Sequence, residues 1–117
     1  MRINKTFGIS LIPFLLFSCN PNYKNVIVSG FVKDEHQLHP IARATVIVKY
    51  WVFNPKINES ESVTRKIISN DNGYFFLKVG EAEALNLHVL AEGYKSEEKF
   101  LTIRKSSIEE TFLLESQ

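Results

Sequence analysis

The feature of this sequence that most constrains its fold is a series of short apolar runs with alternating polarity. Across residues 26–117, no window repeats apolar residues every three or four positions, as an amphipathic helix would. Instead, β-branched and aromatic residues form short runs separated by Gly, Asn, Asp and Pro. We therefore expect an all-β, seven-stranded antiparallel Greek-key β-sandwich, although strand number alone does not separate a sandwich from a barrel. The runs predict strands at residues 26–33, 42–53, 62–69, 74–80, 84–92, 97–104 and 109–114.

Alternation within the runs predicts which side chains face the core, because neighbouring residues of a strand point to opposite faces. The strongest turn signal is Asn70-Asp71-Asn72-Gly73, since Asn and Asp side chains bond to the local backbone and Gly73 can adopt a positive φ. The residues expected on the inward phase are Val26, Val28, Gly30, Val32, Ala44, Val46, Val48, Phe75, Leu77, Val79, Leu87, Val89 and Ala91.

The first residues have the layout of a secretory signal. A basic stretch, Met1–Lys5, precedes the uncharged and mostly apolar segment Phe7–Phe17. That segment would rise about 16 Å as a helix, roughly half the hydrocarbon thickness of a bilayer, so we do not expect it to span a membrane. Pro13 in its middle also disfavours a permanent membrane helix.

The only cysteine follows this segment directly, in Leu16-Phe17-Ser18-Cys19. The four residues resemble a bacterial lipobox, with Phe17 standing where a small residue is more usual. The resemblance implies cleavage between Ser18 and Cys19, diacylglycerol on the Cys19 sulfur and acylation of the new amino group. The alternative is an ordinary secretory signal that leaves Cys19 as a free thiol.

These features give the expected domain organisation. Residues 1–18 are a lipoprotein signal peptide, residues 19–25 are the lipidated cysteine and a polar tether, and residues 26–117 are one folded domain. We expect the protein to be located in the bacterial cell envelope. A lipid on Cys19 would anchor it there, and we expect the membrane to be the outer membrane.

Composition narrows the function further. With a formal net charge of +1, the chain lacks the excess of basic residues that is typical of nucleic-acid-binding proteins. A single cysteine allows no internal disulfide and no Cys-rich zinc site. We therefore expect no nucleic-acid partner, no metal and no cofactor.

Four motifs in order carry a family resemblance: Ser29–Asp34, Pro40–Val48, Ser69–Phe75 and Leu87–Lys95. Together they resemble the carboxypeptidase regulatory-like domain family, over roughly residues 26–114. The resemblance implies a transthyretin-like β-sandwich and no reaction, since such domains serve as folding or binding modules. Ala42 departs from the family pattern, and Tyr50–Glu61 is a longer and more aromatic connection than usual.

Residues that could carry chemistry are few. His36 and His39, with Asp34 or Glu35, could hold zinc, but two solvated turn histidines are the simpler interpretation. His88 is expected on the outward phase of its strand. A small transthyretin-like hydrolase would need a cleft that joins His88 to Arg104 or Lys78, and Thr111–Gln117 lacks the terminal motif of that enzyme family. We expect no catalytic residues.

The aromatic stretch after Val48 is the main binding candidate. If the inward phase continues through Tyr50, then Ile47, Trp51 and Phe53 lie on the outer face, where they could contact a protein partner or a glycan. A β-bulge near Tyr50 would instead rotate Trp51 into the core. Also on outward phases are Phe31, Tyr74 and Phe76.

The resulting hypothesis is a lipid-anchored, non-catalytic module that binds or scaffolds an envelope protein through sheet edges or the Trp51 face. A carbohydrate-binding module using Trp51 and Phe53 is the first alternative. A small hydrolase is the second.

Overall fold

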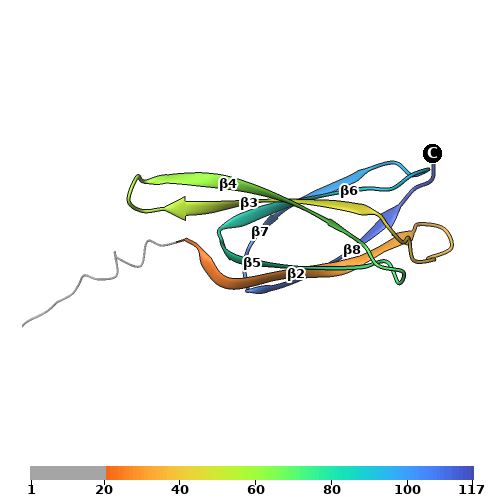
Figure 1. Ribbon diagram of the computed structural model, residues 1–117, viewed down its shortest axis with the longest axis horizontal. Helices are drawn as coiled ribbons and strands as arrows, with labels where there is room; N and C mark the ends of the chain where they lie inside the picture. The colour runs from red at the N-terminus through yellow and green to blue at the C-terminus, as the bar shows by residue number, and fades with distance from the viewer. Residues whose placement is uncertain (1–20) are drawn as a thin grey trace, which may run out of the picture.

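A computed structural model describes residues 21–117, which form a sandwich of two β-sheets (Figure 1). The predicted all-β class is confirmed, and the described residues include no helix that could cross a membrane. The strands are β2 (Tyr23–Asp34), β3 (Thr45–Asn54), β4 (Glu59–Ile68), β5 (Tyr74–Ala82), β6 (Ala84–Leu90), β7 (Glu97–Thr102) and β8 (Ser107–Leu114).

The two sheets are unequal. One has three strands in the order β5-β2-β8, and the other has four in the order β4-β3-β6-β7. The pairs are antiparallel except β2–β8, which runs parallel from Ile27 opposite Ser107 to Asp34 opposite Leu114. The parallel pair departs from the fully antiparallel expectation because β8 arrives from the other sheet, not through a hairpin with β2.

Strand positions agree with the predicted ones to within a few residues, and the differences have local causes. β2 begins at Tyr23, inside the segment expected to be a tether. β3 begins at Thr45, not residue 42, because Arg43 has a φ of 62° and interrupts the extended backbone. The predicted turn is present: Asn70 Oδ1 accepts the N–H groups of Asn72 and Tyr74, and Gly73 has a φ of 72°.

The core lies between the two sheets and follows the predicted alternation. Val79 and Ala91 are half-buried at its margin rather than buried. Phe75 and Phe112 pack with ring centroids 6.3 Å apart. The fully or nearly buried hydrophobic residues are Val26, Val28, Val32, Ile41, Ala44, Val46, Val48, Tyr50, Phe75, Leu77, Ala82, Leu85, Leu87, Val89, Ile103, Phe112 and Leu114.

One buried polar side chain fastens the end of β4 to the chain before β3. The Ser69 hydroxyl donates to the Ile41 carbonyl and accepts the Ala44 N–H, both at 2.8 Å. Both hydrogen bonds are made, so the buried hydroxyl carries no desolvation penalty from a missing partner.

Gly30 sets the spacing between β2 and β8. A Cβ at this position would lie 1.8 Å from the Glu110 carbonyl oxygen and 2.8 Å from the Phe75 ring. Both obstacles are packed parts of the sandwich, so β8 and the core would have to shift together to admit even one methyl group.

Gly30→Ala is expected to lower the free energy of unfolding by about 3 kcal/mol or more, because overpacking against backbone leaves no cheap relaxation. Urea denaturation measures the loss. Gly80→Ala is the matched control: its Cβ meets nothing within 4 Å, and only the strain of its φ of 93° remains, worth about 1 kcal/mol. Equal losses from the two variants would contradict the close approach at Gly30.

Candidate functional site

Ile47, Trp51 and Phe53 lie on the outer face of the four-stranded sheet. The β3–β4 pairing is unbroken from Thr45–Ile68 to Asn54–Glu59, so no bulge rotates the strand near Tyr50. Tyr50 is 6% exposed and packs in the core, while Trp51 and Phe53 are half-exposed on the opposite phase. The inward and outward phases of β3 therefore match those inferred from the sequence.

Phe100 of β7 joins this face, and the sequence analysis did not single it out. Its ring is 62% exposed and meets Trp51 with centroids 5.8 Å apart at an angle of 62°. Lys49 Nζ lies 5.3 Å from the Trp51 ring. We call Ile47, Trp51, Phe53 and Phe100 the aromatic face. The Trp51 and Phe100 rings are tilted against each other, so these two form an apolar ridge beside a cation and are not coplanar.

Phe31, Tyr74 and Phe76 lie on the outer face of the other sheet, on the far side of the sandwich from Trp51. Phe31 and Tyr74 are opposite each other in the β2–β5 pair, with ring centroids 5.2 Å apart. They border a hollow that also includes Glu109 and Thr111 of β8. The outward aromatic residues therefore form two separate groups, which alternation alone did not reveal.

The β3–β4 hairpin extends beyond the end of β6 and is held there by Asn22. Trp51 is the last residue of β3 paired with β6. The Asn22 side chain then accepts the Phe53 N–H and donates to the Phe53 carbonyl, both at 2.9 Å. The Asn22 side chain thus continues the hydrogen-bond ladder along β3, at a position where β6 no longer pairs with it. On the other strand of the hairpin, the Ser60 hydroxyl bonds to Glu83.

The outer edge of β4, which we call the β4 edge, is long and uncovered. All ten residues of β4 except Ile67 are exposed, on both faces of the strand. On β3, Trp51 and Phe53 direct their backbone bonds away from β4, to Glu83 and Asn22. Alternation then directs the backbone groups of Ser60, Ser62, Thr64 and Lys66 to the β4 edge.

The opposite side of the sandwich is closed by Lys99. This lysine occupies an inward phase of β7, and its Nζ bonds to Glu110 Oε1 and the Thr111 carbonyl of β8, each at 3.1 Å. The same Nζ lies 4.7 Å from the Phe112 ring. An inward-pointing charge on a short edge strand is a common protection against strand addition. The β4 edge is therefore more accessible to another strand than the β7 edge on the opposite side of the sandwich.

The histidines are dispersed. His36 and His39 are exposed in the loop after β2. In this loop Asp34 Oδ1 accepts hydrogen bonds from the backbone N–H groups of His36 and Gln37, which stabilises the turn. His88 lies on the outer face of β6, whereas Lys78 lies on the outer face of the other sheet. Among residues 21–117, no three His, Cys, Asp or Glu side chains gather as a metal site requires.

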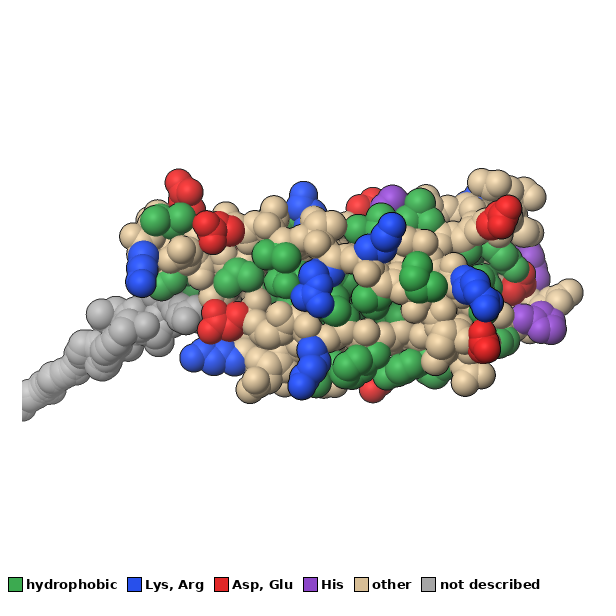
Figure 2. Space-filling model, viewed as in Figure 1, with side chains coloured by type: hydrophobic (Ala, Val, Ile, Leu, Met, Phe, Trp, Pro, Cys, Tyr) green, Lys and Arg blue, Asp and Glu red, His purple; other side chains and the backbone are tan. Residues whose placement is uncertain are grey.

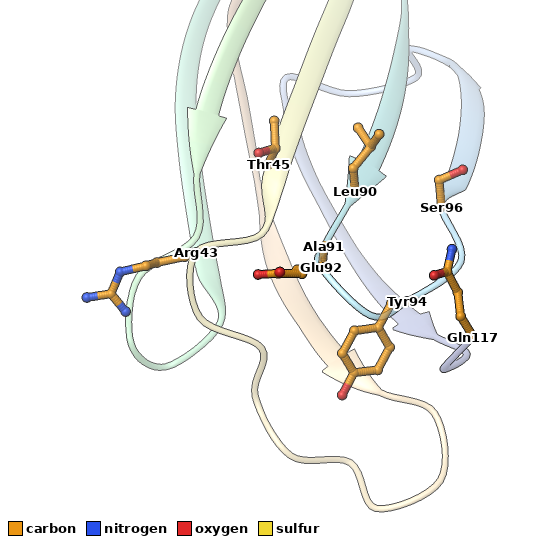
Figure 3. A pocket seen from close by; sticks show the side chains of 8 residues that line it. All are labelled: Arg43, Thr45, Leu90, Ala91, Glu92, Tyr94, Ser96 and Gln117. Carbon is orange, nitrogen blue, oxygen red and sulfur yellow. The ribbon is translucent and has the colours of Figure 1, made fainter.

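A shallow hollow of about 500 Å³ lies at the end of the sandwich where the chain terminates (Figure 3). Arg43, Glu92, Tyr94 and Gln117 are among its lining residues, and the Arg43 side chain extends away from the others. The Tyr94 hydroxyl donates to Asp34 Oδ2 at 2.9 Å, which raises the pKa of Tyr94.

Comparisons with known proteins identify a fold. A scan against protein-family models and a search of curated proteins gave no match. Among solved structures, 3-chlorocatechol 1,2-dioxygenase from Rhodococcus opacus 1CP is similar at a TM-score of 0.66 and 14% identity, over 80% of this chain and 60% of that one. The chain spans 54% to 60% of the length of this enzyme and of two other similar structures, a hydroxyquinol 1,2-dioxygenase and a catechol 1,2-dioxygenase.

Pilus proteins share the sandwich too. The group B streptococcus pilus 2b backbone protein has a TM-score of 0.57 and 15% identity, with 79% of this chain and 41% of that one covered. The C-terminal domain of shaft pilin spaA from Lactobacillus rhamnosus GG has a TM-score of 0.53 and 11% identity, with 82% and 98% covered. At these identities the likeness shows the fold alone.

Phe100→Ala is expected to shift the fluorescence emission of Trp51 to longer wavelength, because Trp51 loses the ring that shields its edge. Trp51 is the only tryptophan, so the spectrum reports this position alone. The free energy of unfolding should change by about 1 kcal/mol or less, the range for a solvent-exposed aromatic pair. An unchanged spectrum would contradict the Trp51–Phe100 contact, and Phe76→Ala on the other sheet is the matched control.

Asp34 is expected to make stability depend on acid pH. Hydrogen bonds from the Gln37 N–H and the Tyr94 hydroxyl lower the pKa of Asp34 below its ordinary value of 3.8. Because the folded-state pKa is the lower one, the carboxylate stabilises the fold above 3.8, and this contribution is lost as pH falls through the folded-state pKa.

The difference in urea midpoint between the natural chain and Asp34→Asn, followed from about pH 6 to pH 2.5, should therefore shrink with acid. Tyr94→Phe removes one of the two main contacts and should reduce the pH dependence without abolishing it. A difference that stays constant over the whole range would contradict the assignment.

Proposed function

We propose that this chain is a lipid-anchored, non-catalytic β-sandwich module of the bacterial cell envelope that binds or scaffolds protein. The observation that carries the proposal is the β4 edge: ten residues, exposed on both faces and paired only to β3. Such an edge accepts a strand from another chain through backbone hydrogen bonds. The aromatic face lies on the same sheet and can add side-chain contacts.

The anchor is proposed from the leader and the lipobox-like residues that end at Cys19, which lie outside the described residues. Asn22, three residues after Cys19, is hydrogen-bonded to the Phe53 backbone. Three residues reach about 11 Å when fully extended. A lipidated Cys19 would therefore hold the sandwich close to the bilayer, with the tip of the β3–β4 hairpin nearest the attachment point.

Some proteins that share this fold are parts of assemblies. Two of the similar structures are a pilus backbone protein and a shaft pilin. The resemblance to carboxypeptidase regulatory-like domains points in the same direction. The dioxygenases share the sandwich over part of their length, and we transfer no activity from them, because at 12% to 14% identity the likeness shows the fold alone.

Cys19→Ala is expected to release the protein from the membrane, because removal of the sulfur removes the site of diacylglycerol attachment and stable anchoring needs more than one acyl chain. Membrane fractionation and intact mass measure the result. The natural chain should sediment with membranes and carry the added mass of its acyl chains.

Asn20→Ala is the matched control, since it changes the neighbouring residue and keeps Cys19; it should stay with the membrane. The anchor is contradicted if the natural chain has the mass of an unmodified polypeptide, or if Cys19→Ala distributes as the natural chain does.

A further inference from the structure

We infer that the β4 edge pairs with the β4 edge of a second copy of this chain, antiparallel and centred on Val63. The inference deepens the proposed function, on which it rests, by naming the partner of the same edge. The argument uses the exposure of β4, the distribution of its charges and the register that these charges allow.

The β4 edge is the least protected edge among the described strands. β7 has six residues and the β8 edge has eight, and Lys99 of β7 bonds to Glu110 and to the Thr111 carbonyl of β8, so these two edges face each other across one ion pair. The β5 edge is interrupted near Gly80, where the β2–β5 register shifts and φ is 93°. β4 runs for ten residues in continuous register with β3. Long edges in regular register pair readily with another strand unless their charges prevent it.

The charges on β4 are separated by sign along the strand. Glu59 and Glu61 lie in the half near the hairpin tip, and Arg65 and Lys66 lie in the other half. Parallel pairing of two copies would place like charges side by side. Antiparallel pairing places the acidic half of each copy against the basic half of the other, which stabilises the pair. Figure 2 shows hydrophobic side chains exposed between Lys and Arg side chains along the middle of the molecule.

The alternation of side chains restricts the register. Residues opposite each other in a continuous sheet must point to the same face, so odd residues of β4 pair with odd residues. With Val63 opposite Val63 of the second copy, Glu61 lies opposite Arg65 in both halves of the pair, and the hydroxyl-bearing Ser62 lies opposite Thr64. Moving the centre to Thr64 would place Glu61 opposite Ile67 and remove both ion pairs.

The backbone is compatible with this arrangement. Ser60, Ser62, Thr64 and Lys66 direct their N–H and C=O groups to the β4 edge, so Ser62 and Thr64 would exchange hydrogen bonds across the two copies. Val63 then forms a pair without backbone bonds, in which Cα atoms lie about 4.5 Å apart. Because the two-fold axis is perpendicular to the sheet, both N-termini reach one bilayer when the sheet lies parallel to it. Confinement to a membrane raises the effective concentration of such a weak pair.

Oxidative crosslinking in membranes that carry the full chain tests the register. Val63→Cys should give a disulfide-linked dimer, because about 4.5 Å between Cα atoms lies within disulfide geometry. Thr64→Cys should give little dimer, because its two copies are diagonal neighbours, about 7–8 Å apart between Cα atoms. The natural chain, with Cys19 alone, reports any dimer made by an unacylated Cys19 and so separates a failed anchor from failed pairing. Equal crosslinking by the two variants, or none by Val63→Cys, overturns the inference.

A charge exchange tests the partner contacts without a new cysteine. In membranes treated with an amine-reactive crosslinker, Glu61→Arg and Arg65→Glu should each reduce the dimer yield of the full chain, and the double variant should restore it. Glu59→Arg, which makes the same charge change opposite Ile67 of the second copy, should have the smaller effect. Failure of the double variant to restore the dimer while it remains folded overturns self-pairing. An anchor still proved by the acyl mass would leave the proposed envelope location intact.

Discussion

The structure depends on a mismatch between its two sheets. Three strands face four, so one strand of the larger sheet is left mostly uncovered. β4 is that strand, and its exposed residues are polar or charged with few exceptions. Because Ile67 is the one residue of β4 that packs against the core, β4 is held mainly by β3, by Ser69 at one end and by the Ser60–Glu83 bond at the other. The apolar area that stabilises the fold is buried elsewhere, which leaves β4 available for contact with another molecule.

Much of this architecture follows from the alternation of residues. The alternation of Val46, Val48 and Tyr50 predicts which side chains of β3 face the core, and it correctly places Trp51 on the outer face. Contacts that depend on strand order were not predictable in this way. Phe100 meets Trp51 because β7 pairs with β6, and Phe31 lies on the other side of the sandwich because β2 belongs to the other sheet. Alternation describes one strand at a time and carries no information on its neighbours.

The N-terminal boundary shows a second limit of the sequence. A polar segment with asparagines was expected to be a tether, yet Asn22 supplies an amide that pairs with the Phe53 backbone. Its donor and acceptor imitate those of a peptide group, so a residue typical of linkers completes a β-ladder. The domain therefore begins close to Cys19, which gives the proposed anchor a short reach. The same sandwich occurs in dioxygenases and pilus proteins, so function must be argued from such surface features and not from the fold.

Amide hydrogen exchange at the β4 edge tests the central claim, that β4 is the interaction surface, most directly. In the dilute Cys19→Ala protein, the amides of Ser60, Ser62, Thr64 and Lys66 should exchange rapidly, because they lack a backbone partner, while those of Glu61, Val63, Arg65 and Ile67 are protected by β3. In the membrane-bound natural chain the first set should gain protection. Rapid exchange of that set in both forms would contradict the account.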